Sequence, residues 1–242
     1  MVDYQPTVAR AGARPAVDEG LRAYMNKVYM HMASAMVVTG LVAFAFGTNA
    51  NLLAIVYGTP LKWVAMFAPL GFALFFGAMV HRMSASMATI LFYAFSVLMG
   101  ISISYIFARY TGMSIFTTFF ATAVAFLGLS LYGYTTKSDL SGIGRFCVMG
   151  LIGVIVVSLL NFFFIQSSPL HYAISAIGVL VIAGLTAYDT QQIKNNYLMM
   201  AQAGADGVAY LQKGAIIGAF SLYLNFINMF LMLLQFMGAS NE

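Results

Sequence analysis

The chain has 242 residues, of which 62% are apolar and only 7% are charged, with a formal net charge of +4. Ordinary globular domains are about 45–50% apolar and about 25% charged, and a soluble chain of this size could not hide so much apolar surface from water. The composition excludes an ordinary cytosolic enzyme, a disordered protein and a small secreted scaffold, and it predicts a chain whose solvent is the lipid bilayer. The single cysteine, Cys147, excludes an intramolecular disulfide and a cysteine-rich metal site, and the small, scattered positive charge does not indicate nucleic-acid binding.

The first 21 residues are polar and contain two prolines. We expect residues 1–21 to form a flexible cytoplasmic tail and residues 22–242 to form one membrane domain. No short apolar segment near the start ends in a cleavage site, so we expect no removable signal peptide.

Six long uncharged intervals follow the tail, and one of them is long enough for two spans. A helix needs about 20 apolar residues to cross roughly 30 Å of hydrocarbon. The interval from Phe146 to Tyr188 is too long for one helix, and we expect it to break at Gln166-Ser-Ser-Pro169, where proline suits a first helical turn and serine caps it. In chain order the expected spans are about 28–47, 62–80, 84–108, 113–134, 145–165, 169–188 and 213–237.

The intervals are continuously apolar, without the two-residue alternation of a membrane β-barrel. Helices satisfy all their backbone groups internally, as lipid requires. The sequence therefore predicts an all-α integral membrane protein with seven transmembrane helices and, because every loop is short, no soluble catalytic domain.

Basic residues predict the orientation. If the N-terminus lies in the cytoplasm, only Lys62 and Arg109 fall outside, and nine basic residues fall inside: Arg10, Arg14, Arg22, Lys27, Arg82, Lys137, Arg145, Lys194 and Lys213. Cytoplasmic loops carry an excess of lysine and arginine, so this orientation is favoured. The side of the C-terminus stays open, because no basic residue follows Lys213.

Asp189 differs from the other acidic residues, which fall in predicted tails or loops. Ionisable groups inside a membrane cost about 2.5–3.5 kcal/mol on insertion scales, and Asp189 stands at the expected inner end of the sixth span. One interpretation is an interfacial carboxylate that pairs with Lys194. The other is a functional group, which is favoured because a carboxylate at a helix C-terminus is opposed by the helix dipole.

The seventh span carries a polar stripe. Ser221, Asn225, Asn228 and Gln235 fall within an arc of about 80° at 100° per residue, and Gly214 and Gly218 continue it. A helix that faces lipid would not keep three amides on one side, so we expect this stripe to face the bundle interior. It either holds helices together by close packing and amide hydrogen bonds, or it lines a path for an ion or water.

Enzyme chemistry finds no support in the motifs. Tyr188-Asp189 is similar to a motif of intramembrane aspartyl proteases, but that chemistry needs two carboxylates, and no second acid lies in any apolar interval. No Gly-x-Ser-x-Gly with a suitable histidine and no nucleotide-binding motif is present. We therefore expect a protein that is not an enzyme and has no cofactor.

Three segments, 129–142, 184–194 and 221–230, closely resemble the Bax inhibitor-1 family, also called the transmembrane Bax inhibitor motif family, in its bacterial form. The resemblance covers about residues 21–238. It implies the bacterial inner membrane, six helices around a central seventh, and a pH-sensitive calcium leak. In family members with that leak, two carboxylates on helices six and seven latch the pore and share a proton; the first corresponds to Asp189, whereas the second position holds Asn225 here.

The Asn225 departure predicts altered behaviour. Two close carboxylates share a proton, but an aspartate and an asparagine can be bridged by a hydrogen bond while the acid is ionised. Calcium prefers several oxygen ligands, usually including carboxylates. We therefore expect a changed pH response and only weak calcium binding at Asp189. Asn225, Asn228 and Ser221 would line or latch the path, and Arg82 would be a counter-charge to Asp189.

A second function is also implied by the resemblance. Some bacterial relatives bind an ATP-dependent membrane protease and modulate its action on membrane proteins, and the basic tail of residues 1–21 is what such a partner could hold. Besides the lipid bilayer, the expected partners are therefore calcium as a transported ion or, in the alternative, a membrane protease.

Overall fold

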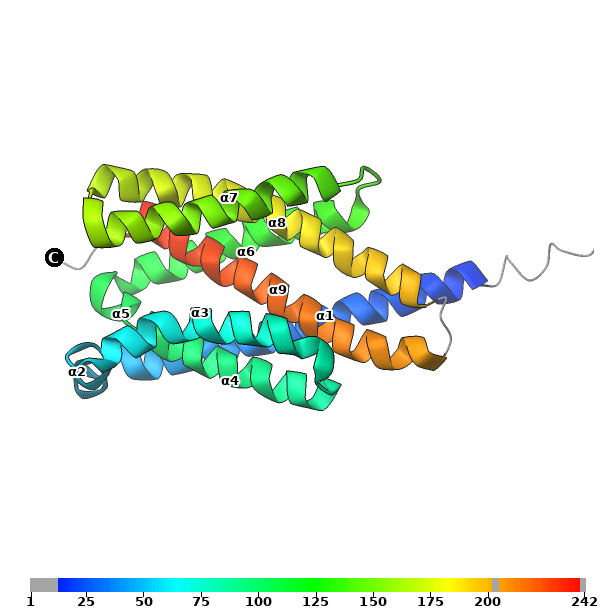
Figure 1. Ribbon diagram of the computed structural model, residues 1–242, viewed down its shortest axis with the longest axis horizontal. Coiled ribbons are helices and arrows are strands. Elements are labelled where there is room, and N and C mark those ends of the chain that lie inside the picture. The colour runs from blue at the N-terminus through cyan, green and yellow to red at the C-terminus, as the bar shows by residue number, and fades with distance from the viewer. Residues whose placement is uncertain (1–12, 202–204, 240–242) are drawn as a thin grey trace, which may run out of the picture.

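The computed structural model describes residues 13–201 and 205–239, and within them all regular structure is helical (Figure 1). Residues 1–12 of the expected tail lie outside the described residues. The helices are α1 (Ala13–Gly47), α2 (Ala50–Tyr57), α3 (Leu61–Met79), the 3₁₀ turn η1 (Val80–Arg82), α4 (Ala85–Ile103), α5 (Ile106–Arg109), α6 (Gly112–Thr135), α7 (Ser141–Leu160), the π-helical turn η2 (Asn161–Ile165), α8 (Ser168–Met200) and α9 (Ala205–Met237).

Seven of these segments in the described part of the chain are long and apolar enough to cross a membrane, which confirms the predicted number of spans. They are Asp18–Gly47, Leu61–Arg82, Ala85–Arg109, Gly112–Thr135, Ser141–Ile165, Ser168–Met200 and Tyr210–Met237. The short helix α2 lies in the connection between the first and second spans, and α5 forms the end of the third.

The break between the fifth and sixth spans lies where the sequence places it. Gln166 adopts a left-handed backbone conformation with φ of 52°, which ends η2. Ser167 then caps α8, its Oγ accepting a hydrogen bond from the backbone N–H of Leu170 at 3.4 Å, and Pro169 lies in the first turn. The proline has no N–H to lose at this position, and the serine satisfies one of the free amides of the turn.

Three helix ends differ from the expected boundaries. Helix α1 begins at Ala13, so residues 13–21, which we expected in the flexible tail, are helical. Helix α8 continues to Met200 and α9 begins at Ala205, so most of residues 189–212, which lie between the expected sixth and seventh spans, is helical too. Charges mark the edge of the hydrocarbon rather than the end of a helix. No glycine or proline interrupts residues 189–200, and the α8 extension packs on α1, where the rings of Tyr24 and Tyr197 lie 5.1 Å apart.

Helix α9 is the most buried of the seven described spans. It packs against α8, α1, α6 and α4, and Figure 1 shows it crossing the bundle obliquely. Helix α3 packs mainly on α4, and α7 on α8. The placement of all six helices around a central seventh stays a prediction.

Close approach of α6 and α7 fixes the position of α8. A Cβ on Gly133 of α6 would collide with the backbone carbonyl of Ala187, and one on Gly144 of α7 would collide with the ring of Tyr188. Both glycines let a neighbouring helix lie directly against the segment of α8 that precedes Asp189. Small residues at helix contacts are the usual way that membrane helices pack closely.

The basic residues gather at one end of the bundle. This basic end comprises the first half of α1, η1, the α6–α7 connection, the start of α7, the last turns of α8 and the start of α9 (Figure 1), with Arg22, Lys27, Arg82, Lys137, Arg145, Lys194 and Lys213. Lys62 and Arg109 lie at the opposite end. The location of the basic end in the cytoplasm stays a prediction.

Candidate functional site

The carboxylate of Asp189 meets the amide of Asn225 across the α8–α9 contact. Asn225 Nδ2 donates a hydrogen bond to Asp189 Oδ2 at 2.8 Å. Asn225 is only 6% exposed, and Asp189 is half-buried. The Asp189 carboxylate is thus held by an amide from the next span.

The sequence argument that placed Asp189 at a helix C-terminus is wrong. Helix α8 continues about three turns beyond it to Met200, so the end of the helix dipole does not act on this carboxylate. The pairing with Lys194 is also wrong. Lys194 Nζ donates to the backbone carbonyl of Tyr134 at 2.6 Å and lies 5.7 Å from the centre of the Tyr134 ring.

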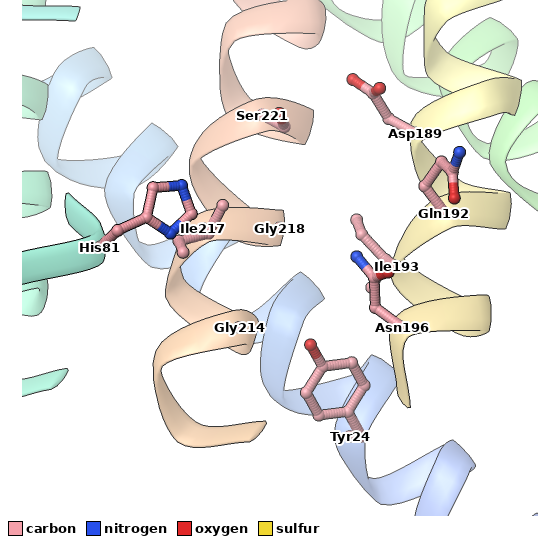
Figure 2. A pocket seen from close by; sticks show the side chains of 10 residues that line it. All are labelled: Tyr24, His81, Asp189, Gln192, Ile193, Asn196, Gly214, Ile217, Gly218 and Ser221. Atoms are coloured by element: carbon pink, nitrogen blue, oxygen red, sulfur yellow. The ribbon is translucent and has the colours of Figure 1, made fainter. Parts of the chain in front are cut away.

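A cavity of about 230 Å³ extends from Asp189 towards the basic end. Helix α8 and helix α9 supply most of its wall, with Tyr24 from α1 and His81 from η1 (Figure 2). Asn196 and His81 are exposed, whereas Asp189 and Ser221 are half-buried, so the cavity runs from the surface inwards to the acid. The full lining is Tyr24, His81, Asp189, Gln192, Ile193, Asn196, Gly214, Ile217, Gly218 and Ser221.

The sequence explains why space remains between α8 and α9. Gly214 and Gly218, one turn apart on α9, present no side chain to the cavity. On α8, Gln192 and Asn196 follow Asp189 by three and seven residues, which places all three on one face of the helix. That spacing is visible in the sequence, so the two amides could have been predicted once the helix was known to continue past Asp189.

The polar stripe of α9 faces α8. Besides the Asn225 contact, Gln235 Oε1 accepts a hydrogen bond from Ser175 Oγ at 2.9 Å. Ser221 lines the cavity. The side chain of Asn228 is half-buried and makes no hydrogen bond to another described residue. One end of the stripe therefore joins two helices, and the other end borders open space.

Arg82 does not face Asp189, contrary to the expectation from the sequence. Arg82 is exposed in η1 and is not part of the cavity wall. Within the described residues, Asp189 is bonded to Asn225 and forms no ion pair with Arg82. The preceding residue, His81, lines the cavity instead.

Lys213 links two helical segments at the edge of the cavity by hydrogen bonds. Its Nζ donates to the backbone carbonyls of His81 at 2.7 Å and Met83 at 3.2 Å. These bonds join the start of α9 to the α3–α4 turn and keep His81 beside the cavity. This contact could not be predicted from the sequence, because its acceptors are backbone carbonyls, which every residue has.

Among the described residues, Asp189 is the sole carboxylate in the cavity wall. The structure contains no group of three or more His, Cys, Asp and Glu side chains that could hold a metal ion, within its described residues. The arrangement can accept one positive charge next to neutral oxygen donors.

The fold and this site define a seven-helix membrane protein with one acid held between its last two spans. A sequence profile described as "Inhibitor of apoptosis-promoting Bax1" matches residues 21–242, and the chain belongs to this Bax inhibitor-1 family. An uncharacterized protein of Rickettsia prowazekii is 45% identical over 98% of both chains. "Inner membrane protein YbhL" of Escherichia coli is 42% identical over 90% of this chain and 92% of its own length. An uncharacterized protein of Caulobacter vibrioides is 42% identical over 99% of this chain and 97% of its own.

Proposed function

We propose that this protein lies in the bacterial inner membrane and provides a passive path for cations, closed by the Asp189–Asn225 contact. The observation that carries the proposal is the 2.8 Å hydrogen bond between α8 and α9 at the inner end of a polar cavity. A calcium leak is what the resemblance to the family implies, and the relative named an inner membrane protein supports the location.

The closed state follows from where the hydrogen bond lies. Asn225 is buried among the spans, while the cavity on the other side of Asp189 reaches exposed residues. A cation that enters the cavity meets the carboxylate, and the Asn225 contact closes the path beyond it. Movement of α9 away from α8 breaks this contact and joins the cavity to the polar stripe at Asn228.

The contact needs no shared proton. Two neighbouring carboxylates titrate as a coupled pair, whereas one carboxylate and one amide stay bonded while the acid is ionised. We therefore expect the leak of the natural protein to depend on pH less than that of the Asn225→Asp variant. Cation flux into proteoliposomes, measured for both proteins over a series of pH values, checks this, and equal pH dependence would contradict it.

Removal of the Asp189 charge tests the function itself. Asp189→Asn keeps the shape of the side chain but removes the negative charge, so the cavity loses its attraction for cations. We expect cation flux into proteoliposomes to fall roughly tenfold, the change that corresponds to about 1.4 kcal/mol.

Asp139→Asn is the matched control. Asp139 is exposed in the α6–α7 connection, where its Oδ1 accepts a hydrogen bond from the backbone N–H of Ser141 at 2.9 Å. The same change at this acid should leave the flux as it is. Flux of the natural protein no greater than that of empty vesicles, or equal flux in the Asp189→Asn variant, would refute the proposal.

Regulation of an ATP-dependent membrane protease, the other function that the resemblance implies, stays a prediction. It depends on a tail whose residues 1–12 lie outside the described part of the chain. Deletion of residues 1–12 separates the two functions, because a cation path does not need the tail, whereas a partner that holds the tail would be lost.

A further inference from the structure

The charge around the cavity is small. The described residues of its wall include three ionisable side chains, Tyr24, His81 and Asp189, and of these only Asp189 carries a carboxylate. At the edge, Lys213 lies against the carbonyls of His81 and Met83, and Arg82 stands next to His81 in η1. A cation in the cavity therefore meets one negative charge, with positive charges near the entrance.

The other groups near the cavity that could bind a cation are neutral oxygens. Gln192 Nε2 donates to the hydroxyl of Tyr188 at 2.8 Å, which leaves its Oε1 free as an acceptor. Ser221, Asn196 and Tyr24 add a hydroxyl, an amide and a phenol. Asn225 uses its Nδ2 for Asp189. The volume of about 230 Å³ has room for roughly seven waters at about 30 Å³ each.

From this charge balance we propose that the path selects monovalent cations over calcium, an inference that rests on the cation path proposed above. Calcium is bound in proteins by six to eight oxygens, several of them carboxylates. One carboxylate neutralises a monovalent cation fully but leaves a divalent cation with an uncompensated charge inside a membrane span, where a net charge is costly. Neutral oxygens and retained waters meet the weaker demand of a monovalent ion.

Position 225 sets this preference. Its amide donates to Asp189 and adds no charge. A carboxylate at the same place would put a second acid, from a second helix, next to Asp189 at the inner end of the cavity, and the two acids together would match the charge of calcium. The choice between asparagine and aspartate at this position thus decides which charge class of cation the path accepts.

Competing fluxes test the preference. The full-length protein is placed in liposomes that contain dyes for K⁺ and Ca²⁺, and the initial influx of each ion is measured at equal concentrations. We expect the ratio of K⁺ flux to Ca²⁺ flux to exceed one in the natural protein and to fall roughly tenfold in Asn225→Asp, since a tenfold change corresponds to about 1.4 kcal/mol.

Gln235→Glu is the matched control. It makes the same change from amide to acid on the same stripe of α9, at a residue bonded to Ser175 and not to Asp189, and it should leave the ratio as it is. A ratio of one or less in the natural protein overturns the inference while the cation path stands. An equal ratio in Asn225→Asp, or an equal fall in Gln235→Glu, also overturns it. Absence of flux for both ions refutes the path itself and the inference with it.

Discussion

At the scale of single residues, the candidate site depends on one hydrogen bond, between Asp189 and Asn225. Asp189 is the acid that the sequence singles out, and its carboxylate is bonded to a side chain that is almost fully buried. A hydrogen bond to a charged group contributes more than one between neutral groups, and a partly buried charge without a partner is costly. The contact therefore stabilises the packing of α8 on α9 as well as closing the path.

Asn225→Ala removes that partner. We expect it to lower the free energy of unfolding by about 1.5–3 kcal/mol, the usual range for a hydrogen bond to a charged group. The measurement is the unfolding of the purified protein in mixed micelles with increasing denaturant.

Asn228→Ala, one turn further along α9, serves as the comparison. The side chain of Asn228 is half-buried and makes no hydrogen bond to another described residue, so its truncation should cost less than about 1 kcal/mol, as is usual away from such contacts. Equal losses in the two variants would show that the Asp189 bond contributes nothing specific.

At the scale of helices, α8 is the element on which the site depends. Its middle is held by α6 and α7 through Gly133 and Gly144. Gln191, next to the acid-bearing face, donates to the carbonyl of Ser138 at 2.8 Å and accepts from the N–H of Leu140 at 2.9 Å. These contacts fix α8 from the side opposite α9, so α9 is the better candidate for movement.

Gly133→Ala tests the close helix contact. The added methyl group would collide with the carbonyl of Ala187, and we expect a loss of about 1–3 kcal/mol in the free energy of unfolding, typical of overpacking.

Gly128→Ala, on the same helix, is the control. Gly128 is exposed and has open space around the position of a Cβ, and alanine favours helix more than glycine does. This variant should be as stable as the natural protein or slightly more stable. If both variants lose the same stability, the contact between α6 and α8 is not the cause.

At the scale of the whole molecule, the separation of basic residues predicts the orientation in the membrane. Seven basic residues lie at the basic end, and Lys62 and Arg109 lie at the other. By the excess of lysine and arginine in cytoplasmic loops, the entrance of the cavity should open to the cytoplasm.

Cysteine labelling in intact cells checks this. In a Cys147→Ser background, Lys62→Cys and Lys137→Cys place one exposed thiol at each end of the bundle. A maleimide that cannot cross the inner membrane should label position 62 and should label position 137 only after the cells are opened. The reverse pattern would place the cavity entrance outside and contradict the orientation.

The number of spans, the helical class and the break before α8 could be predicted from the sequence, because they depend on local properties. A run of apolar residues, a proline in a first turn and a serine cap act within a few residues of one another. The family resemblance and the polar stripe likewise pointed to Asp189 and Asn225 as the residues of interest.

The partners of those residues depended on the tertiary structure. Arg82 and Lys194 are basic and near in topology, yet Lys194 bonds to a carbonyl on α6 and Arg82 is exposed. The cavity arises where two glycines of α9 face three polar residues of α8, with Tyr24 and His81 from helices far away in the chain. Composition and periodicity indicate which side chains each helix presents to its surroundings. Which of those side chains meet depends on how the helices cross, because a hydrogen bond requires atoms within about 3 Å of each other.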